Sequence, residues 1–199
     1  PPQPTTTTTT TKSFNATINR LSSEGAHHDG LLTYSSMLKH YTPPDAHTFP
    51  SLLKACTSLN LLSHGLSFHQ LIVINGYSSD AYIASSLINF YAKIGYAHIA
   101  RQVFEMIPDR NIVPWTAMIG CYSRAGDVNT AFCLFSRMRR EGIQPSSVTM
   151  LGMITGVSEC TQVQCLHACA LRYGFGSDIA FVNSMLNMYG KCGRVEDAK

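Results

Sequence analysis

Apolar residues recur in this chain at the spacing of one face of an α-helix, and the same stripe returns several times. Within each copy they follow the i, i+3, i+4, i+7 spacing that is typical of an amphipathic helix. The copies are Phe14, Ile18 and Leu21; Ala84, Leu87, Ile88 and Tyr91; Trp115, Met118, Ile119 and Tyr122; and Val182, Met185, Leu186 and Tyr189. A glycine follows each copy, at positions 25, 95, 126 and 193. Because glycine readily adopts left-handed geometry, each one predicts a helix end.

A second helix is predicted after the glycine. In GDVNTAFCLFSRMRREGIQP (126–145), Asp127 is a candidate N-cap, arginines fill the last turns, and Gly142 with Pro145 ends the helix. The apolar stripe of this helix comprises Val128, Ala131, Leu134, Phe135 and Met138. A small residue stands early in each second helix, which suits the close approach of paired helices, and these residues are Gly30, Ala100, Ala131 and Ala198.

The segments 46–80 and 147–178 are variants of the same plan. Each has an apolar first helix, then a histidine (His69 or His167) at the same distance before an aspartate (Asp80 or Asp178). The second variant is three residues shorter, and the loss falls near 157–166. We expect either a shortened second helix or a rebuilt turn there.

The chain therefore divides into helix-pair repeats at 11–45, 46–80, 81–111, 112–146, 147–178 and an incomplete 179–199. No strand pattern competes with the helical one. Because one helix pair cannot bury its own apolar face, the repeats predict an all-α fold of stacked pairs, an α-solenoid. The leader PPQPTTTTTT (1–10) is of low complexity and is expected to be extended or disordered. It is consistent with the end of an organelle transit peptide, or with an unstructured leader that carries no targeting signal.

Composition narrows the class of protein further. The chain of 199 residues is 45% hydrophobic and 14% charged, which supports a packed core rather than a disordered chain. Its net charge of +3 permits a polyanionic partner without requiring one. Seven cysteines, most of them within apolar helical patterns, indicate reduced thiols rather than a disulfide framework. No apolar stretch is long enough to span a membrane. The chain starts with proline and stops inside a repeat, so we expect a segment of a longer protein.

The repeats resemble a known family. IVPWTAMIGCYSRAGDVNTAFCLFSRMRREGIQPS (112–146) is similar to a standard pentatricopeptide repeat of 35 residues, 81–111 to its short variant and 46–80 to its long variant. The order P, L, S, P, L, S over 11–199 resembles the PLS subclass of land plants. Tetratricopeptide repeats keep 34 residues throughout, which argues against them.

The resemblance implies both a shape and a function. It implies a right-handed superhelix that binds single-stranded RNA at about one base per repeat, in a mitochondrion or chloroplast, with the mitochondrion slightly preferred. PLS proteins mostly guide C-to-U editing through C-terminal extensions, with editing cofactor proteins docking on L repeats. No H-x-E followed by P-C-x-x-C occurs here, so we expect no catalytic domain in this segment. We also expect no metal, cofactor, small-molecule substrate or membrane partner.

A polar stripe runs beside the apolar one on the first helices, and we expect it to face the RNA. It comprises Asn15, Asn19 and Ser22; Ser85, Asn89 and Ala92; Thr116, Gly120 and Ser123; and Asn183, Asn187 and Gly190. The family reads a base with the fifth and last residues of a repeat. The pairs implied here are Asn15 with Asp45, Ser85 with Asn111, and Thr116 with Ser146, and the weaker L-repeat pairs are Pro50 with Asp80 and Leu151 with Asp178.

The family's rules translate these pairs into bases. Asn15 with Asp45 implies uracil, Ser85 with Asn111 implies adenine, and Thr116 with Ser146 implies a purine. Asn183 favours a pyrimidine, although its partner lies beyond Lys199. The implied sequence, from 5′ to 3′, begins with U-N-A-R.

Further residues are expected to contact the RNA outside the base edges. The second residue of a repeat packs against base faces in the family, and Val113 and Tyr82 fit that role here, whereas Lys12 and Ala180 depart from the apolar preference. Lys93, Arg124 and Lys191 stand two places before the turn glycines. They are candidates for phosphate contacts, or they complement the negative end of the helix dipole.

Two other functions compete with RNA reading. The cluster Cys160, Cys165, His167 and Cys169 lacks the C-x₂-C spacing of structural zinc sites, and His69 repeats the histidine without cysteines, so we expect no metal there. The alternative to RNA reading is a helical-repeat scaffold that binds proteins. A protein-binding groove would carry more aromatic or aliphatic anchors than the short polar stripe found here.

Overall fold

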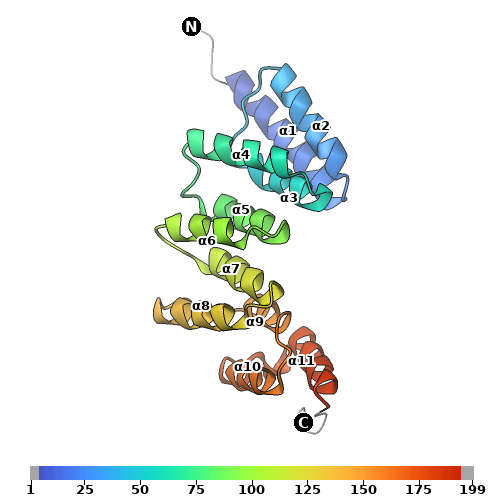
Figure 1. Cartoon of the computed structure of the whole chain (residues 1–199). Helices are drawn as coiled ribbons and strands as arrows, with labels where there is room; N and C mark the ends of the chain where they lie inside the picture. Colours follow the sequence, from blue (N-terminus) through green and yellow to red (C-terminus); the bar gives the residue numbers. More distant parts are fainter. Residues whose placement is uncertain (1–4, 194–199) are drawn as a thin grey trace. The chain divides into compact units, whose positions relative to one another are not determined.

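A computed structural model describes residues 5–193 of the chain. These residues form eleven α-helices and one short 3₁₀ helix, with no strand among them (Figure 1). They fall into two compact bodies, an N-terminal body that ends at Pro108 and a C-terminal body that begins at Asp109. The predicted all-α fold of helix pairs is therefore confirmed. None of the helices between residues 5 and 193 is both long and apolar enough to cross a membrane.

The N-terminal body contains three helix pairs. They are α1 (Thr5–Ser23) with α2 (His27–Lys39), α3 (Phe49–Leu59) with α4 (Leu62–Ile74), and α5 (Ala81–Lys93) with α6 (Ala97–Met106). The first helices of the pairs contact one another in sequence, α1 against α3 and α3 against α5. Side chains from both helices of the pairs are fully buried in this body, among them Ile18, Met37, Phe49, Leu52, Ile88 and Phe104.

The C-terminal body repeats the plan. It contains α7 (Ile112–Arg124) with α8 (Val128–Arg140), α9 (Ser147–Ile154) with α10 (Cys160–Arg172), then the 3₁₀ turn η1 (Phe175–Ser177) and α11 (Ile179–Lys191). The first helices again contact one another, α7 against α9 and α9 against α11. The predicted helix after Gly126 is confirmed in detail, since Asp127 accepts a hydrogen bond from the Thr130 amide at 3.1 Å and the whole apolar stripe of α8 is buried.

The turn glycines explain where the first helices end. Gly25, Gly95, Gly126 and Gly193 all have φ between 68° and 87°. A residue with a Cβ resists this left-handed geometry, so glycine at these positions ends the first helix at low cost. The prediction drawn from the four glycines is confirmed.

The start of the first helix differs from the expectation. Residues 5–10 were expected to be extended or disordered, but α1 already begins at Thr5. No glycine or proline separates the threonines from the apolar turn that begins at Phe14, so nothing stops the helix from extending toward the N-terminus. Threonine in a helix costs only about 0.7 kcal/mol per residue relative to alanine. Residues 1–4 lie outside the described part of the chain.

The three residues missing from the fifth repeat are lost from its first helix, while the turn after that helix is longer, residues 155–159 against 60–61. The second helices α4 and α10 both have 13 residues, whereas α9 has 8 residues against 11 in α3. A shortened second helix is therefore wrong, and a rebuilt turn is right. The cause is a contact with the preceding repeat: the Gly156 amide donates to Ser123 Oγ at 3.0 Å, and Ser123 Oγ donates to the Met153 carbonyl at 2.8 Å. Because these groups bond Ser123, the helix ends at Ile154.

Candidate nucleic-acid interface

The first predicted reading pair is joined by direct hydrogen bonds in the N-terminal body. Asn15 on α1 donates from Nδ2 to Oδ1 of Asp45 at 2.8 Å, and its own Oδ1 accepts from the Thr48 hydroxyl at 2.7 Å. Thr48 in turn accepts from the Asp45 amide at 3.0 Å. Thr48 is completely buried and Asn15 is 6% exposed, so the three residues form a closed network beneath a half-buried carboxylate.

The chemistry of this network fixes how Asn15 points. The carboxylate of Asp45 only accepts hydrogen bonds, so the Asn15 atom that faces it must be the amide nitrogen. The Thr48 oxygen already accepts from the Asp45 amide, and its single proton has two acceptors within reach, the Asn15 side-chain oxygen at 2.7 Å and Oδ1 of Asp45 at 3.2 Å, of which Asn15 is the nearer. One N–H of Asn15 is left over, and Oδ2 of Asp45 takes part in none of these bonds. The pair therefore presents one donor and one acceptor side by side.

The C-terminal body contains a matching arrangement with different side chains. Thr116 on α7 lies 2.7 Å from Thr149, oxygen to oxygen, and Thr149 lies 3.2 Å from the Ser146 hydroxyl. Thr149 is completely buried, like Thr48, while Thr116 and Ser146 are half-buried. The Ser146 amide donates to Thr149 at 3.3 Å, as the Asp45 amide does to Thr48. The predicted pair Thr116 and Ser146 is thus also joined through a buried threonine.

The rest of the polar stripe contributes to packing between first helices. Ser51 on α3 donates to the side-chain oxygen Oδ1 of Asn19 at 2.6 Å, and Lys54 donates to the Ser22 backbone carbonyl at 3.2 Å. In the C-terminal body, a Cβ added to Gly152 would come within 3.7 Å of the Gly120 backbone. The stripe positions therefore lie at the contacts between neighbouring repeats as well as beside the candidate reading pairs.

The last residue of most repeats is also the N-cap of the next first helix. Side-chain oxygens accept from backbone amides of the first turn, in the manner that favours Asp, Asn and Ser at this position. The capping residues are Asp80 before α5, Asn111 before α7, Ser146 before α9 and Asp178 before α11. Asp45 differs, because Thr48 stands at the N-cap of α3 and the Asp45 carboxylate bonds Asn15 and the His47 amide. Capping therefore accounts for the residue type at four last positions, but not at Asp45.

The remaining fifth residues vary in exposure. Ser85 is 3% exposed and bonds the Ala81 carbonyl within its own helix, and its partner Asn111 belongs to the other body. Pro50 is buried in the first turn of α3, Leu151 is half-buried, and Asn183 is exposed on α11. Neither Pro50 nor Leu151 offers a side-chain polar group, so these two L repeats have no hydrogen-bonding side chain at the fifth position.

The candidate stacking and phosphate residues lie at the surface. Tyr82 is 67% exposed and Val113 is 44% exposed, each in the first turn of its helix. Lys93, Arg124 and Lys191 are exposed in the last turns of α5, α7 and α11. A Cβ added to Gly120 would come within 2.9 Å of an Arg124 guanidinium nitrogen, so Arg124 extends over the polar stripe of its own helix.

The repeated histidines bind tyrosines of the following repeat. His69 Nδ1 lies 2.7 Å from the Tyr91 hydroxyl, and His167 Nδ1 lies 3.0 Å from the Tyr189 hydroxyl, with the same separation of 22 residues in both bodies. Partial burial lowers the pKa of His69 below its usual value. The histidine was recognised in the sequence as a repeat feature, but its tyrosine partner was not.

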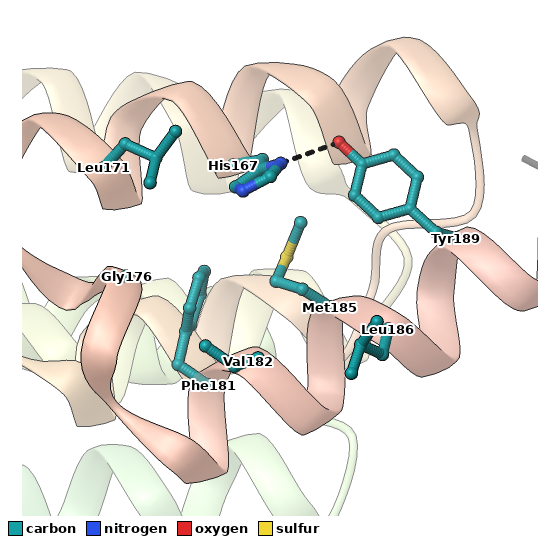
Figure 2. A pocket seen from close by; sticks show the side chains of 8 residues that line it. All are labelled: His167, Leu171, Gly176, Phe181, Val182, Met185, Leu186 and Tyr189. Atoms are coloured by element: carbon teal, nitrogen blue, oxygen red, sulfur yellow. Dashed lines mark hydrogen bonds between the residues drawn. The ribbon is translucent and has the colours of Figure 1, made fainter. Parts of the chain in front are cut away.

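A cavity of about 240 Å³ lies beside the second of these contacts, between α10 and α11 (Figure 2). Its walls are mostly apolar, with Met185 next to the His167–Tyr189 bond and with Phe181 and Leu171 further from it. In the N-terminal body Ile88, the counterpart of Leu186, is fully buried, whereas Leu186 is 46% exposed. The lining of the cavity fits the packing of apolar side chains rather than a polar ligand.

The cysteine cluster does not form a metal centre among residues 5–193. No group of three or more His, Cys, Asp or Glu side chains in that range is placed to hold a metal ion. Cys165 is exposed, and Cys160 contacts the Cys192 carbonyl at 3.6 Å. Burial raises the pKa of Cys56 to about 12, so that thiol is a packing residue rather than a nucleophile.

Thr48 and Thr149 were not selected from the sequence. Thr48 directly precedes an apolar helix, in TFPSLLKAC, and Thr149 lies in the first turn of another, in TMLGMITGV, where threonine is easily taken for a surface or cap residue. The sequence did contain one indication of their role: both threonines are the third residue of a long repeat.

The fold and the site together define a helical-repeat protein of the α-solenoid class, and comparison with known proteins gives the family. The model of the PPR repeat family matches residues 110–159, and that of the PPR repeat matches 82–112 and 181–199. A pentatricopeptide repeat-containing protein of Arabidopsis thaliana is 59% identical over 189 residues, 95% of this chain and 26% of that protein. A putative mitochondrial one from the same plant is 34% identical over 191 residues, 92% of this chain and 30% of that protein. The chain belongs to the pentatricopeptide repeat family.

Solved structures share the fold at low sequence identity. The pentatricopeptide repeat protein PPR10 in complex with an 18-nt psaJ RNA element matches with a TM-score of 0.72 at 18% identity, over 94% of this chain and 27% of that one. The nuclear proteinaceous RNase P 2 of A. thaliana matches with a TM-score of 0.63 at 13% identity, over 92% of this chain and 43% of that one. The chain spans about a quarter of the length of the Arabidopsis protein to which it is 59% identical.

Proposed function

We propose that this chain binds single-stranded RNA and reads it at about one base per repeat. The observation that carries the proposal is the Asn15–Asp45 pair, in which residues 30 positions apart are held 2.8 Å from one another with one donor and one acceptor unused. A uracil offers a carbonyl and an N–H at neighbouring positions on its pairing edge. The spare N–H of Asn15 matches the carbonyl, and Oδ2 of Asp45 matches the N–H. The RNA complex of PPR10, a protein of the same fold, supports the proposal.

The surroundings of the pairs fit an RNA partner. Tyr82 and Val113 are exposed at the start of their helices, where a base can stack on them. Lys93 and Arg124 place positive charge at the other end of the same two helices, and Lys191 does so at the end of α11, where phosphates would be neutralised. In this proposal the repeats contribute recognition, and any chemistry on the RNA belongs to another domain or partner.

The wider role follows from the PLS pattern and from the relatives. We propose that the protein acts in a plant organelle, preferably the mitochondrion, as the recognition part of an RNA-editing or other RNA-processing factor. The alternation of 35, 35 and 31 residues supports the PLS subclass, and a relative named as mitochondrial supports the location. Editing cofactor proteins are proposed to dock on the long repeats, whose fifth residues Pro50 and Leu151 offer no hydrogen bond to a base.

Equilibrium binding to short RNAs tests the proposal. We expect an RNA with the core 5′-U-N-A-R to bind more tightly than permutations of the same bases, and the affinity of both to fall as salt is raised, since cationic side chains displace counterions. The permuted RNAs control for charge and length, and a duplex of the same sequence controls for single-strand preference. Equal affinity for every permutation would contradict base reading and leave a protein-binding scaffold as the better description.

A further inference from the structure

We propose that Thr48 and Thr149 are positioning residues that set the base preference of the repeat before their own. The inference rests on the proposed function and adds the residues that orient the reading pair. Each threonine is the third residue of a long repeat, and each reaches back 33 positions to the fifth residue of the preceding standard repeat. A base-reading pair would then be a set of three residues, of which the third never meets the RNA.

The register of the other repeats supports a specific role for these two. The third residues of the remaining repeats that follow another repeat are Ile83, Pro114 and Phe181. None has a side-chain hydroxyl, so none can link a fifth residue to a last residue. The threonine therefore occurs at the two junctions where the preceding fifth residue is Asn15 or Thr116, and is absent where that residue is Pro50, Ser85 or Leu151.

The energetic argument concerns the orientation of the Asn15 amide. In the folded chain Asn15 is almost buried, so its carbonyl needs a donor, and the Thr48 hydroxyl is the donor provided. With that bond in place the amide nitrogen faces Asp45, and its spare N–H keeps a fixed position relative to the carboxylate. Without it, the buried carbonyl would turn to find water or another donor, and the Asn15 and Asp45 groups would lose their fixed relation. Affinity for RNA in general rests on other contacts and would change less.

The same logic applies to the neutral pair. Thr149 accepts from the Ser146 amide and shares a hydrogen bond with the Thr116 hydroxyl, 2.7 Å away, in which either oxygen can be the donor. The buried threonine thus fixes where the Thr116 hydroxyl lies, while the two hydroxyls can still exchange donor and acceptor roles.

Replacing Thr48 with valine, which has the same shape without the hydroxyl, tests the inference. RNAs that differ only in the base facing the first repeat are compared by fluorescence anisotropy at one salt concentration. We expect the full chain to prefer uracil over cytosine by about tenfold, the effect of one or two polar contacts. In Thr48→Val this preference should fall below about threefold while binding of the cytosine RNA stays the same. Thr48→Ser, which keeps the hydroxyl, should retain the preference.

Thr57→Val is the matched control, because it removes a hydroxyl from the same helix that bonds only the Leu53 carbonyl, at 2.7 Å. It should leave the preference unchanged. An unaltered tenfold preference in folded Thr48→Val overturns the inference and leaves the proposed function standing. A wild-type chain without base preference overturns both. Should Thr48→Val not fold, Thr149→Val carries the same test at the base facing the fourth repeat.

Discussion

The junction between the first and second repeats and the junction between the fourth and fifth share one backbone plan but use different chemistry. In the N-terminal body a buried threonine links an amide to a carboxylate, Asn15 to Asp45. In the C-terminal body the equivalent threonine links two hydroxyls, Thr116 to Ser146. Further along the same helices, Lys54 reaches the Ser22 carbonyl, whereas Gly156 brings its backbone against Ser123.

The difference shows which residues of a junction support the structure and which residues determine the base that is recognised. The threonine and the helix contacts are common to both bodies and hold the first helices together. The fifth and last residues differ, and with them the charge and the donor pattern offered to a base. A pair that contains a carboxylate requires a hydrogen-bond donor on the base, because a carboxylate only accepts. A pair of hydroxyls can exchange donor and acceptor roles and so accepts more than one kind of base. The first repeat should therefore discriminate bases more strongly than the fourth.

The largest expected effect comes from the backbone contact peculiar to the C-terminal body. In Gly156→Ala the new Cβ would lie 1.9 Å from the Ser123 carbonyl oxygen, which cannot move without disturbing α7. We expect a loss of about 3 kcal/mol in the free energy of unfolding, as for strong overpacking, measured by urea denaturation. Gly152→Ala is the control, since its Cβ would meet Gly120 at an ordinary 3.7 Å. Equal stability of the two variants would refute the contact that shortens α9.

A second substitution separates the charged pair from the neutral one. Asn15→Asp places a second carboxylate beside Asp45 at a nearly buried site and removes the donor that joins them. We expect it to cost about 2 kcal/mol of stability and to abolish the preference for uracil. Thr116→Asp faces only neutral partners, Thr149 and Ser146, so its cost should stay below about 1 kcal/mol. Thermal unfolding of both variants measures the difference, and equal losses would remove the contrast between the two junctions.

The smallest expected effect is a pH dependence in the N-terminal body. Burial lowers the pKa of His69 below 6.5, so the folded state favours the neutral imidazole that lies beside Tyr91. The unfolded chain therefore binds more protons as the pH falls, and the contribution of His69 to stability is present above about pH 6.5 and lost below it. Denaturation curves between pH 7.5 and 5 check this. Part of the loss should disappear in His69→Gln, and an unchanged slope would contradict the assignment.

The sequence was sufficient for features that depend on local spacing. The stripe from Trp115 to Tyr122 and the glycines at 95 and 126 predicted helices and turns that are present as expected. The recurrence of His69 and His167 identified a repeat feature, and both histidines lie beside a tyrosine of the following repeat. These features follow from periodicity and backbone geometry, which one repeat displays by itself.

Features that depend on contacts between repeats could not be read in the same way. The bond from Thr48 to Asn15 spans 33 positions, and a threonine in an apolar helix carries no local sign of such a partner. The shortening of α9 depends on Ser123, which belongs to the preceding repeat. The capping role of Asn111 and Ser146 also emerges only once the next helix is present, and it explains these residue types without reference to RNA.

Exchanging the reading pair tests the central claim most directly. In the double variant Asn15→Thr with Asp45→Ser, the first repeat carries the side chains of the fourth, with Thr48 in the place of Thr149. Binding is measured to four RNAs that differ only in the base facing the first repeat. The account predicts that the preferred base changes from uracil to a purine, with the preference at the third repeat unchanged. A preference for uracil that survives the exchange would mean that Asn15 and Asp45 do not read the base.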